Sequence, residues 1–477
     1  EQSGLRRNIL SWNGRFNVSG KSVLKTTFLY SDLFYETPGA LTKTEFENNP
    51  RSARPSGGGF PSAVDAKASI QQKTFLAGLN YRHSFSDEFF YTATAYGMFT
   101  QLKNPAIRNY GKNEDPNVGG RAVLSYTKSF FNLVAGAELQ QGFSSVTVYK
   151  NKGGNADSLQ NLDELRIRQS LVFLQSRFEK SGWELTLGGS LNFLNLSFQR
   201  NYPLPVPTLK RKFSNEFAPR VALSKNWKRV ILYTSVAKGF SPPTTSELLP
   251  SGSEINLALS PEQGINYDVG FRGRIENFSF DVNAFLFSLQ NTIVQRRDAG
   301  GGDYFINAGK TSQKGIETSL SYPFLHSVAF ARQSLLWLSH TWHQFRYKEF
   351  SQLTQNFSGK RLPGISPHSI ASGIDVAVKN GLFANLTYYY NDPVPLNDAN
   401  SEYADAYHLI HAKLGFEKRV TDQVQVRLSA GAENLLNTKY SLGNDINAFG
   451  GRYYNVAPGR SYYVSLRIQL MAKAHRP

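Results

Sequence analysis

The chain has 477 residues, no cysteine and a formal net charge of +17 at pH 7, so disulfides and thiolate metal sites are excluded. Apolar residues make up 40% of it and aromatic residues 13%, but no run of about 18 uncharged apolar residues occurs, which excludes membrane-spanning helices. Lys and Arg are scattered and no nucleic-acid-binding motif is present, so no nucleic acid is expected as a partner.

Segments in which apolar and polar residues alternate follow one another along the whole chain. A period of two is typical of strands with one apolar and one polar face. In chain order the predicted strands are Leu5–Val18, Val23–Tyr35, Thr74–Ser84, Phe89–Gln101, Arg121–Lys128, Asn132–Tyr149, Leu165–Phe178, Trp183–Phe198, Lys212–Ser224, Arg229–Lys238, Tyr267–Arg274, Phe278–Gln290, Tyr304–Tyr322, Val328–Tyr347, Ile365–Val378, Leu382–Tyr390, Ile410–Phe416, Gln423–Glu433 and Tyr462–Leu470. The pattern predicts an up-and-down meander of about 19 strands.

Short polar turns alternate with long connections between these strands. Lys379-Asn380-Gly381 is one of the turns, whereas the segments 36–72, 102–120, 150–162 and 440–460 read as long loops. Most strands have about 10 to 18 residues, more than the usual 5 to 6 of soluble proteins and enough to cross a bilayer. The sequence therefore predicts an all-β fold, a transmembrane antiparallel up-and-down β-barrel of the bacterial outer membrane, with extracellular loops and periplasmic turns. A soluble sandwich is the alternative, and it would bury the apolar faces against a second sheet.

If the strands form a barrel, one face of each strand points out to lipid and the other points inside. The side chains expected to point out to lipid are Leu382, Ala384, Leu386, Val424, Val426, Leu428, Val464, Leu466 and Ile468. Those expected to point inside are Asn385, Gln425, Arg427, Arg467 and Gln469.

Three groups of short motifs resemble the TonB-dependent outer-membrane receptors. They are Gly239-Phe240 with Pro242-Pro243, Glu247-Leu248, Leu259-x-Pro261-Glu262 and Tyr267-Asp268-x-Gly270; Asn307-Ala308-Gly309-Lys310 with Gly315-Ile316-Glu317; and Glu433-Asn434-Leu435-Leu436-Asn437 with Tyr440 and Pro458-Gly459-Arg460. The segment from Tyr35 through Arg54-Pro55 is similar to the subgroup that imports ferric siderophores, including citrate-type chelates.

The resemblance implies energy-coupled uptake of a ferric siderophore or similar anionic chelate. In this family a plug domain sits inside a barrel of about 22 strands, loops capture the ligand, and the TonB complex pulls on the plug. Outer-membrane lipid and lipopolysaccharide are the other expected partners. A passive or structural barrel without a plug, or a TonB-dependent importer of cobalamin or an oligosaccharide, remains an alternative.

The family pattern also indicates which parts this sequence lacks. Residues 1–470 are expected to form the barrel, truncated at its N-terminal end without the plug and about three strands, and 471–477 a C-terminal tail. An odd strand count makes the first and last strands run in the same direction, so we predict that the strand from Leu5 and the strand ending at Leu470 are not hydrogen-bonded to each other.

Basic and aromatic residues in the predicted loops are the candidate ligand-binding residues, because arginine forks beside aromatic rings suit a planar anionic ligand. They are Arg51, Arg54, Arg108, Tyr110, Lys210, Arg211, Arg296, Arg297, Arg452, Tyr453 and Tyr454. No catalytic arrangement, cofactor or metal site is expected. His340 and His343 are three apart, as are His408 and His411, which places each pair on opposite faces of a strand.

Overall fold

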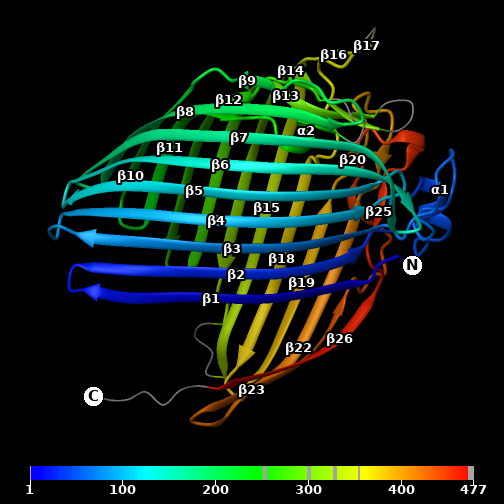
Figure 1. Ribbon diagram of the computed structural model, residues 1–477. Helices are drawn as coiled ribbons and strands as arrows, with labels where there is room; N and C mark the ends of the chain where they lie inside the picture. Colours follow the sequence, from blue (N-terminus) through cyan, green and yellow to red (C-terminus); the bar gives the residue numbers. More distant parts are fainter. Residues whose placement is uncertain (1, 251–254, 298–301, 326–329, 353–354, 471–477) are drawn as a thin grey trace. The chain divides into compact units, whose positions relative to one another are not determined.

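The computed structural model describes residues 2–250, 255–297, 302–325, 330–352 and 355–470 (Figure 1). The chain divides into two units. Unit 1 consists of Glu1–Leu223, Ser235–Ile265 and Ile293–Asn307, and unit 2 of Ser224–Thr234, Asn266–Thr292 and Ala308–Pro477. The predicted tail 471–477 lies outside the described residues.

Unit 1 is a meander of long antiparallel strands that lie side by side in chain order (Figure 1). Its strands are β1 (Leu5–Ser19), β2 (Ser22–Glu36), β3 (Ser69–Ser84), β4 (Phe89–Pro105), β5 (Tyr110–Lys128), β6 (Phe131–Lys152), β7 (Asn155–Lys180), β8 (Trp183–Tyr202) and the short β9 (Leu209–Lys212). β9 pairs with the loop end of β8, and β8 also pairs with β10.

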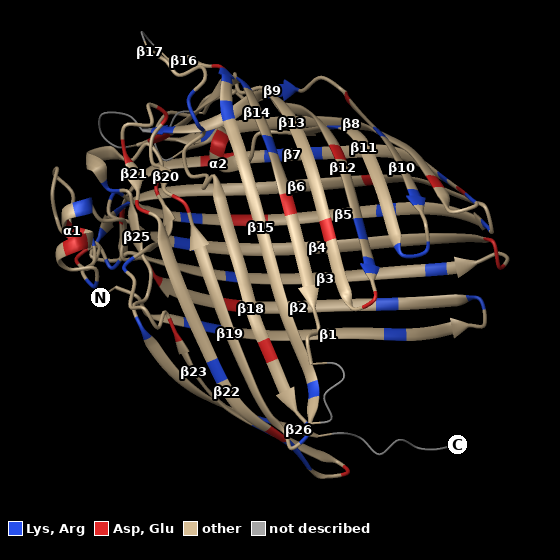
Figure 2. Ribbon diagram, turned by 180° about the vertical axis from the view of Figure 1, so that it is seen from behind, with Lys and Arg blue, Asp and Glu red and all other residues tan. Residues whose placement is uncertain are grey.

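Five strands have residues in both units. They are β10 (Glu216–Asn226), β11 (Val230–Ser241), β12 (Glu262–Ile275), β13 (Phe278–Arg297) and β14 (Asp303–Tyr322). Unit 2 continues the antiparallel order through β15 (Ala331–Glu349), β18 (His368–Val378), β19 (Leu382–Asn391), β22 (Tyr407–Thr421), β23 (Val424–Glu433) and β26 (Ser461–Leu470), which Figure 2 shows from behind.

The connections carry small elements. They are the helices α1 (Lys43–Asn48) and α2 (Thr245–Leu248), the 3-10 helix η1 (Phe449–Gly451), and three two-stranded ribbons made of β16 (Ser351–Gln352) with β17 (Gln355–Asn356), β20 (Val394–Pro395) with β21 (Tyr403–Ala404), and β24 (Ser441–Asn444) with β25 (Tyr454–Val456). No helix in the described part of the chain has the length and apolar character needed to cross a membrane.

The predicted strand count is confirmed. Among the described residues, twenty strands belong to the large sheet, and all of them except the four-residue β9 have ten or more residues. The remaining nineteen match the number expected from the alternation of apolar and polar residues. The all-β class and the antiparallel meander are therefore both readable from the sequence.

Several strands reach further toward the long connections than the sequence predicts, and β5 and β7 extend the most. β5 begins at Tyr110, so the stretch up to Gly120 is strand and not loop, and β7 begins at Asn155 where a loop up to Leu162 was expected. The alternation fails there because both faces of these strand ends are mostly polar. Hydrogen bonding continues nevertheless, and the ladder between β5 and β6 extends to the pair Tyr110 and Tyr149.

The predicted faces of unit 2 are confirmed where the side chains can be followed. Val464 is 75% exposed and Leu466 62% exposed, so the apolar face of β26 is not packed against a second sheet. On the opposite face, Asn385 donates to Asp375 at 2.5 Å and Arg427 lies 3.6 Å from the Glu417 carboxylate. The first face is outer and the second inner, and the sandwich alternative is wrong.

Large inner-face rings lie over glycines of the neighbouring strand. Gly119 is directly opposite Tyr96 and Gly136 opposite Phe173 in unit 1; in unit 2 the pairs are Gly373 with Trp337, Gly415 with Phe383 and Gly431 with Tyr463. A Cβ atom added at Gly415 would lie 2.3 Å from the Phe383 ring. These five glycines therefore leave the space into which the rings of the inner face fold.

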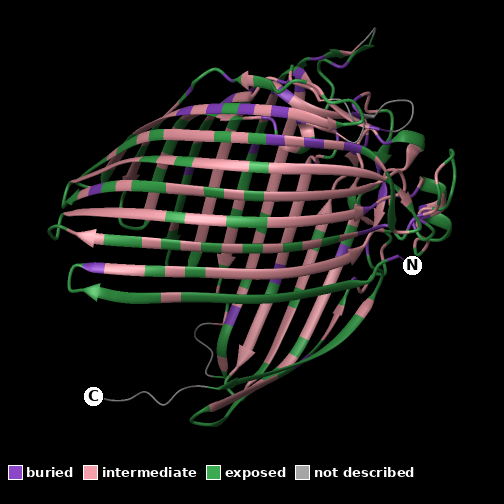
Figure 3. Cartoon of the chain, in the orientation of Figure 1, coloured by how far each residue is buried: buried purple, intermediate pink, exposed green. Residues whose placement is uncertain are grey.

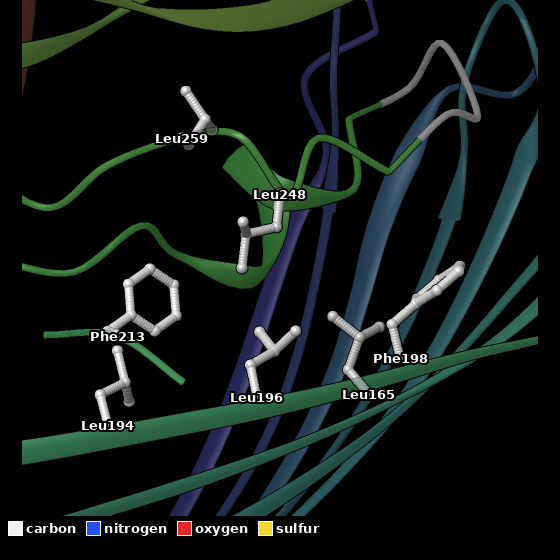
Figure 4. Packing of buried hydrophobic residues seen from close by; sticks show 7 residues of the cluster. All are labelled: Leu165, Leu194, Leu196, Phe198, Phe213, Leu248 and Leu259. Atoms are coloured by element: carbon white, nitrogen blue, oxygen red, sulfur yellow. The ribbon is translucent and has the colours of Figure 1, made fainter. Parts of the chain in front are cut away.

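Burial increases toward the long connections of unit 1 (Figure 3), where one compact apolar cluster forms. Its buried members are Leu165, Leu194, Leu196, Phe198, Phe213, Leu248 and Leu259 (Figure 4). The first four come from the inner faces of β7 and β8, and the others from the segments that follow β9 and β11. The cluster attaches a connecting segment to the inner face of the sheet.

Candidate functional site

The connection from β11 to β12 begins with a short helix whose start is fixed by a capping box. The Thr244 hydroxyl accepts from the Glu247 backbone N–H at 3.3 Å, and the Glu247 carboxylate accepts from the Thr244 N–H at 2.6 Å. The turn directs Leu248, which is fully buried, toward Leu196 on β8 (Figure 4). Helix α2 is thus fixed against the inner face of unit 1.

Side chains of unit 1 hold the rest of this connection in place. Asn307 exchanges two hydrogen bonds with the backbone of Ser260, at 2.8 and 3.0 Å, and the Asn256 side chain donates to the Phe305 carbonyl at 3.0 Å. Arg211 lies over the ring of Phe213, 4.2 Å from its centroid, and donates to the Leu257 carbonyl.

A cavity of about 530 Å³ lies between this connection and the inner face of unit 1. Its polar side chains are Asn113, Asp115, Asn117, Gln140, Ser144 and Gln169. Its apolar side is formed by Met98, Val146, Leu165, Ile167 and Leu249, and the α2 segment adds Thr244, Thr245 and Ser246. We call this cavity the chamber.

The chamber has a defined chemical character. Among the described residues that line it, Asp115 supplies the one carboxylate and accepts a hydrogen bond from the Ser144 hydroxyl. The other polar groups of this lining are amides and hydroxyls that both donate and accept. The side-chain oxygen of Asn117 is buried and has no hydrogen-bond partner among the described residues. Neither Lys nor Arg is among the described residues that line the chamber. The arrangement suits a neutral or cationic ligand with amide groups and apolar linkers.

The candidate residues nearest the N-terminus lie on loops and hairpins of unit 1. Arg51 is exposed and Arg54 half-buried in the connection between β2 and β3, with the Arg54 side chain beside Gly39. Arg108, in the connection between β4 and β5, lies over Phe60, 4.6 Å from the ring centroid, so it contacts the connection that carries Arg51 and Arg54. Tyr110 was wrongly assigned to a loop, because it opens β5 and its ring contacts Tyr149.

The next four candidates are strand residues and not loop residues. Lys210 and Arg211 belong to β9, where Lys210 is exposed and Arg211 holds the α2 connection. Arg296 and Arg297 end β13, and Arg296 is only 4% exposed. The side chain of Arg297 lies outside the described set. The loop assignment fails here because strands extend past the stretch in which apolar and polar residues alternate.

The last three candidates lie in unit 2 on the connection before β26. Arg452 follows the 3-10 helix, and the Tyr453 carbonyl accepts from the Asp445 backbone N–H at 3.0 Å. Tyr454 is buried and pairs with Asn444, so it is a strand residue of β25. None of the eleven candidates is among the described residues that line the chamber.

The histidine pairs face opposite sides of their strands, as predicted. The His408 ring packs on Tyr390 with centroids 4.8 Å apart, whereas the His411 ring meets Tyr389 on the other face at 5.4 Å. No group of three or more His, Cys, Asp or Glu suited to hold a metal ion occurs among the described residues.

Sequence reasoning missed the chamber because it treated residues 102–120 as a loop. A signal was present: Asn113, Asp115 and Asn117 recur with a period of two, as do Gln140 and Ser144 across Gly142. Read as strands, these runs place amide and carboxylate groups on one face. The α2 connection that covers them could not be placed from local pattern alone.

Comparison with known proteins places this arrangement in a family. A sequence profile described as TonB dependent receptor-like, beta-barrel matches residues 11–435. The ferrioxamine B receptor of Salmonella typhimurium (strain SL1344) is 21% identical over 289 residues, which are 59% of this chain and 38% of that receptor. The chain thus matches well under half the length of this curated relative.

Two solved structures share the fold. The ferric citrate transporter FecA in the unliganded form superposes with a TM-score of 0.83 at 14% identity, over 99% of this chain and 71% of that one. The siderophore receptor PiuA from Acinetobacter baumannii gives a TM-score of 0.75 at 14% identity, over 99% and 76%. The chain therefore belongs to the TonB-dependent receptor-like β-barrel family and is an outer-membrane antiparallel barrel protein.

Proposed function

We propose that the chain forms the barrel of a receptor for energy-coupled uptake of a ferric siderophore. The chamber carries the proposal, because it places polar side chains on the inner face of unit 1 under a folded connection. The curated relative named for ferrioxamine B supports a siderophore as the ligand. Coupling to the TonB complex through a plug domain, and residues 1–470 as the barrel portion of a longer receptor, are parts of the same proposal.

The chamber also favours one class of siderophore over another. Asp115 would repel an anionic chelate, whereas amide groups and a carboxylate match a ferric complex with a neutral or cationic surface. The rival proposal is an anionic chelate bound by the eleven basic and aromatic candidates. Arg51 and Arg108 test that rival best. Arg296 is buried, so reversing its charge would destabilise the fold and hide any effect on ligand binding.

Binding of a panel of ferric chelates with graded net charge, including ferrioxamine B and ferric citrate, separates the two ligand classes. Purified protein is titrated and its tryptophan fluorescence followed. We expect Asp115→Asn to weaken binding of the best cationic chelate about tenfold, because a charge-assisted contact is lost. Asp87→Asn, in the turn between β3 and β4, is the matched control and should bind like wild type.

A different pattern of binding would favour the rival proposal, in which basic and aromatic residues bind an anionic chelate. Loss of ferric citrate binding in Arg51→Glu with Arg108→Glu, and full binding in Asp115→Asn, would move the site to the loops. Uptake by cells after the proton gradient is collapsed would instead indicate a passive barrel. No binding of any ferric chelate would leave cobalamin or an oligosaccharide as the ligand.

A further inference from the structure

Two arginines face each other on the outer face of unit 2. Arg346 lies near the loop end of β15, and Arg361, in the connection that follows, forms an antiparallel β-bridge with it. Arg346 is an even number of residues from Leu336 and Leu338 on β15, so it points to the same apolar outer face as these two leucines, of which Leu336 is exposed and Leu338 half-buried. The two guanidinium groups therefore lie above the lipid-facing side of the sheet.

Backbone and amide groups, and not carboxylates, hold these two like charges in the described part of the chain. Opposed like charges destabilise a strand pair, yet neither arginine forms an ion pair among the described residues. Arg346 donates to the Gly359 carbonyl at 2.6 Å, and Asn400 holds the Arg361 backbone through bonds of 2.8 and 2.9 Å. Lys314 of β14, exposed and on the same face, adds a third positive charge.

The arginines line a pocket of about 680 Å³. Its other side chains include Trp342, Gln344, His368, Asp392 and Tyr403. The Asp392 carboxylate accepts a hydrogen bond from the Tyr390 hydroxyl, so one acceptor faces the pocket beside the cations. Cations, aromatic rings and a carboxylate together match a group that carries both phosphate and hydroxyls, such as a phosphorylated sugar.

Along β15, the side chains of the outer face change from apolar to aromatic to cationic toward this pocket. Leu336 is 48% exposed and its cross-strand partner Ile374 41% exposed, and both lie nearer the short-turn end. His340 and Trp342 come next along β15, and Arg346 last. The His340 ring stacks on that of His368, with centroids 5.4 Å apart. An apolar band followed by aromatic rings and then cations is the sequence of environments from acyl chains to a charged headgroup.

We propose that the pocket lined by Arg346 and Arg361 binds the phosphorylated sugar headgroup of a glycolipid in the outer leaflet. Arg346 and Arg361 hold a phosphate between them, Trp342 lies against the sugar, and the acyl chains run down the apolar face past Leu336. The proposal depends on the outer-membrane location of the family and not on the identity of the imported ligand.

Binding of diphosphoryl lipid A to the detergent-solubilised protein tests the pocket. Wild type should bind diphosphoryl lipid A, and Arg346→Gln with Arg361→Gln should weaken that binding about tenfold or more, because two charge-assisted contacts to phosphate are lost. Dephosphorylated lipid A should bind wild type as weakly as diphosphoryl lipid A binds the variant. The control is Lys418→Gln with Arg419→Gln, which removes two charges from the short-turn end of β22 and should change binding less than about twofold.

Three results would overturn the proposal. They are equal affinity of the arginine variant and wild type, equal affinity of wild type for phosphorylated and dephosphorylated lipid, and complete competition by inorganic phosphate, which would assign the pocket to a small anion. Heat-dependent migration of each variant on a gel checks that it is folded. If the double variant does not fold, Lys314→Gln and Trp342→Leu replace it, and unchanged binding in both would equally reject the site.

Discussion

Arg211 was predicted to bind a ligand, but in the structure it holds a connecting segment in place. Its position among basic residues suggested contact with an anionic ligand, but the structure gives it the Phe213 ring and the Leu257 carbonyl as partners. The side chain is a positioning residue for the α2 connection. Nothing in the local sequence indicates this, because Leu257 lies far along the chain.

Replacing Arg211 by alanine should therefore loosen the connection between β11 and β12. We expect chymotrypsin, which cleaves beside Leu248 and Leu257, to cut the variant about fivefold faster or more, because local opening of the segment becomes less costly. The matched control is Lys210→Ala, whose side chain is exposed on the same short strand. Equal cleavage of the two variants would show that Arg211 does not hold the segment.

Strand elements were predictable wherever one face is apolar, and misjudged where both faces are polar. β19, β23 and β26 were recovered closely, because lipid on one side imposes the alternation. The loop ends of β5 and β7 lack that signal, and hydrogen bonding to neighbouring strands defines them instead. The chamber occupies such a polar end, which explains why its residues were missed although the fold was found.

The glycine and aromatic pairs of the inner face give the next prediction. Gly415→Ala should lower the free energy of unfolding by about 1 to 3 kcal/mol, because its Cβ would overlap the Phe383 ring. Adding Phe383→Leu should recover part of the loss, since the smaller side chain frees that space. The unfolding of each variant can be followed by gel migration over a series of urea concentrations. A Gly443→Ala control, at a site with open space, should change little.

At the scale of the whole molecule, the number of strands determines whether the first and last strands can pair in the antiparallel direction. Nineteen long strands that alternate in direction leave the first and last running the same way. β1 is exposed along almost its entire length, as is β26. The absence of hydrogen bonds between these two strands stays a prediction.

Amide hydrogen exchange tests whether β1 and β26 are hydrogen-bonded to each other. If β1 bonds to β2 alone, every second amide of β1 should exchange at least about tenfold faster than amides of the central strand β4, because only alternate groups are in the ladder. The same pattern is expected in β26. Uniform protection of both strands would mean that they pair with each other or with copies of the chain.

The five glycine and aromatic pairs have a consequence for how such a protein can change over time. Each ring occupies volume that only a missing side chain provides, so neither member can be exchanged alone without a fitness cost. In a deep set of natural relatives these positions should covary, with a small inner side chain replacing the ring wherever the glycine is lost. The inner face would then evolve in linked pairs of sites, while the lipid face drifts one residue at a time.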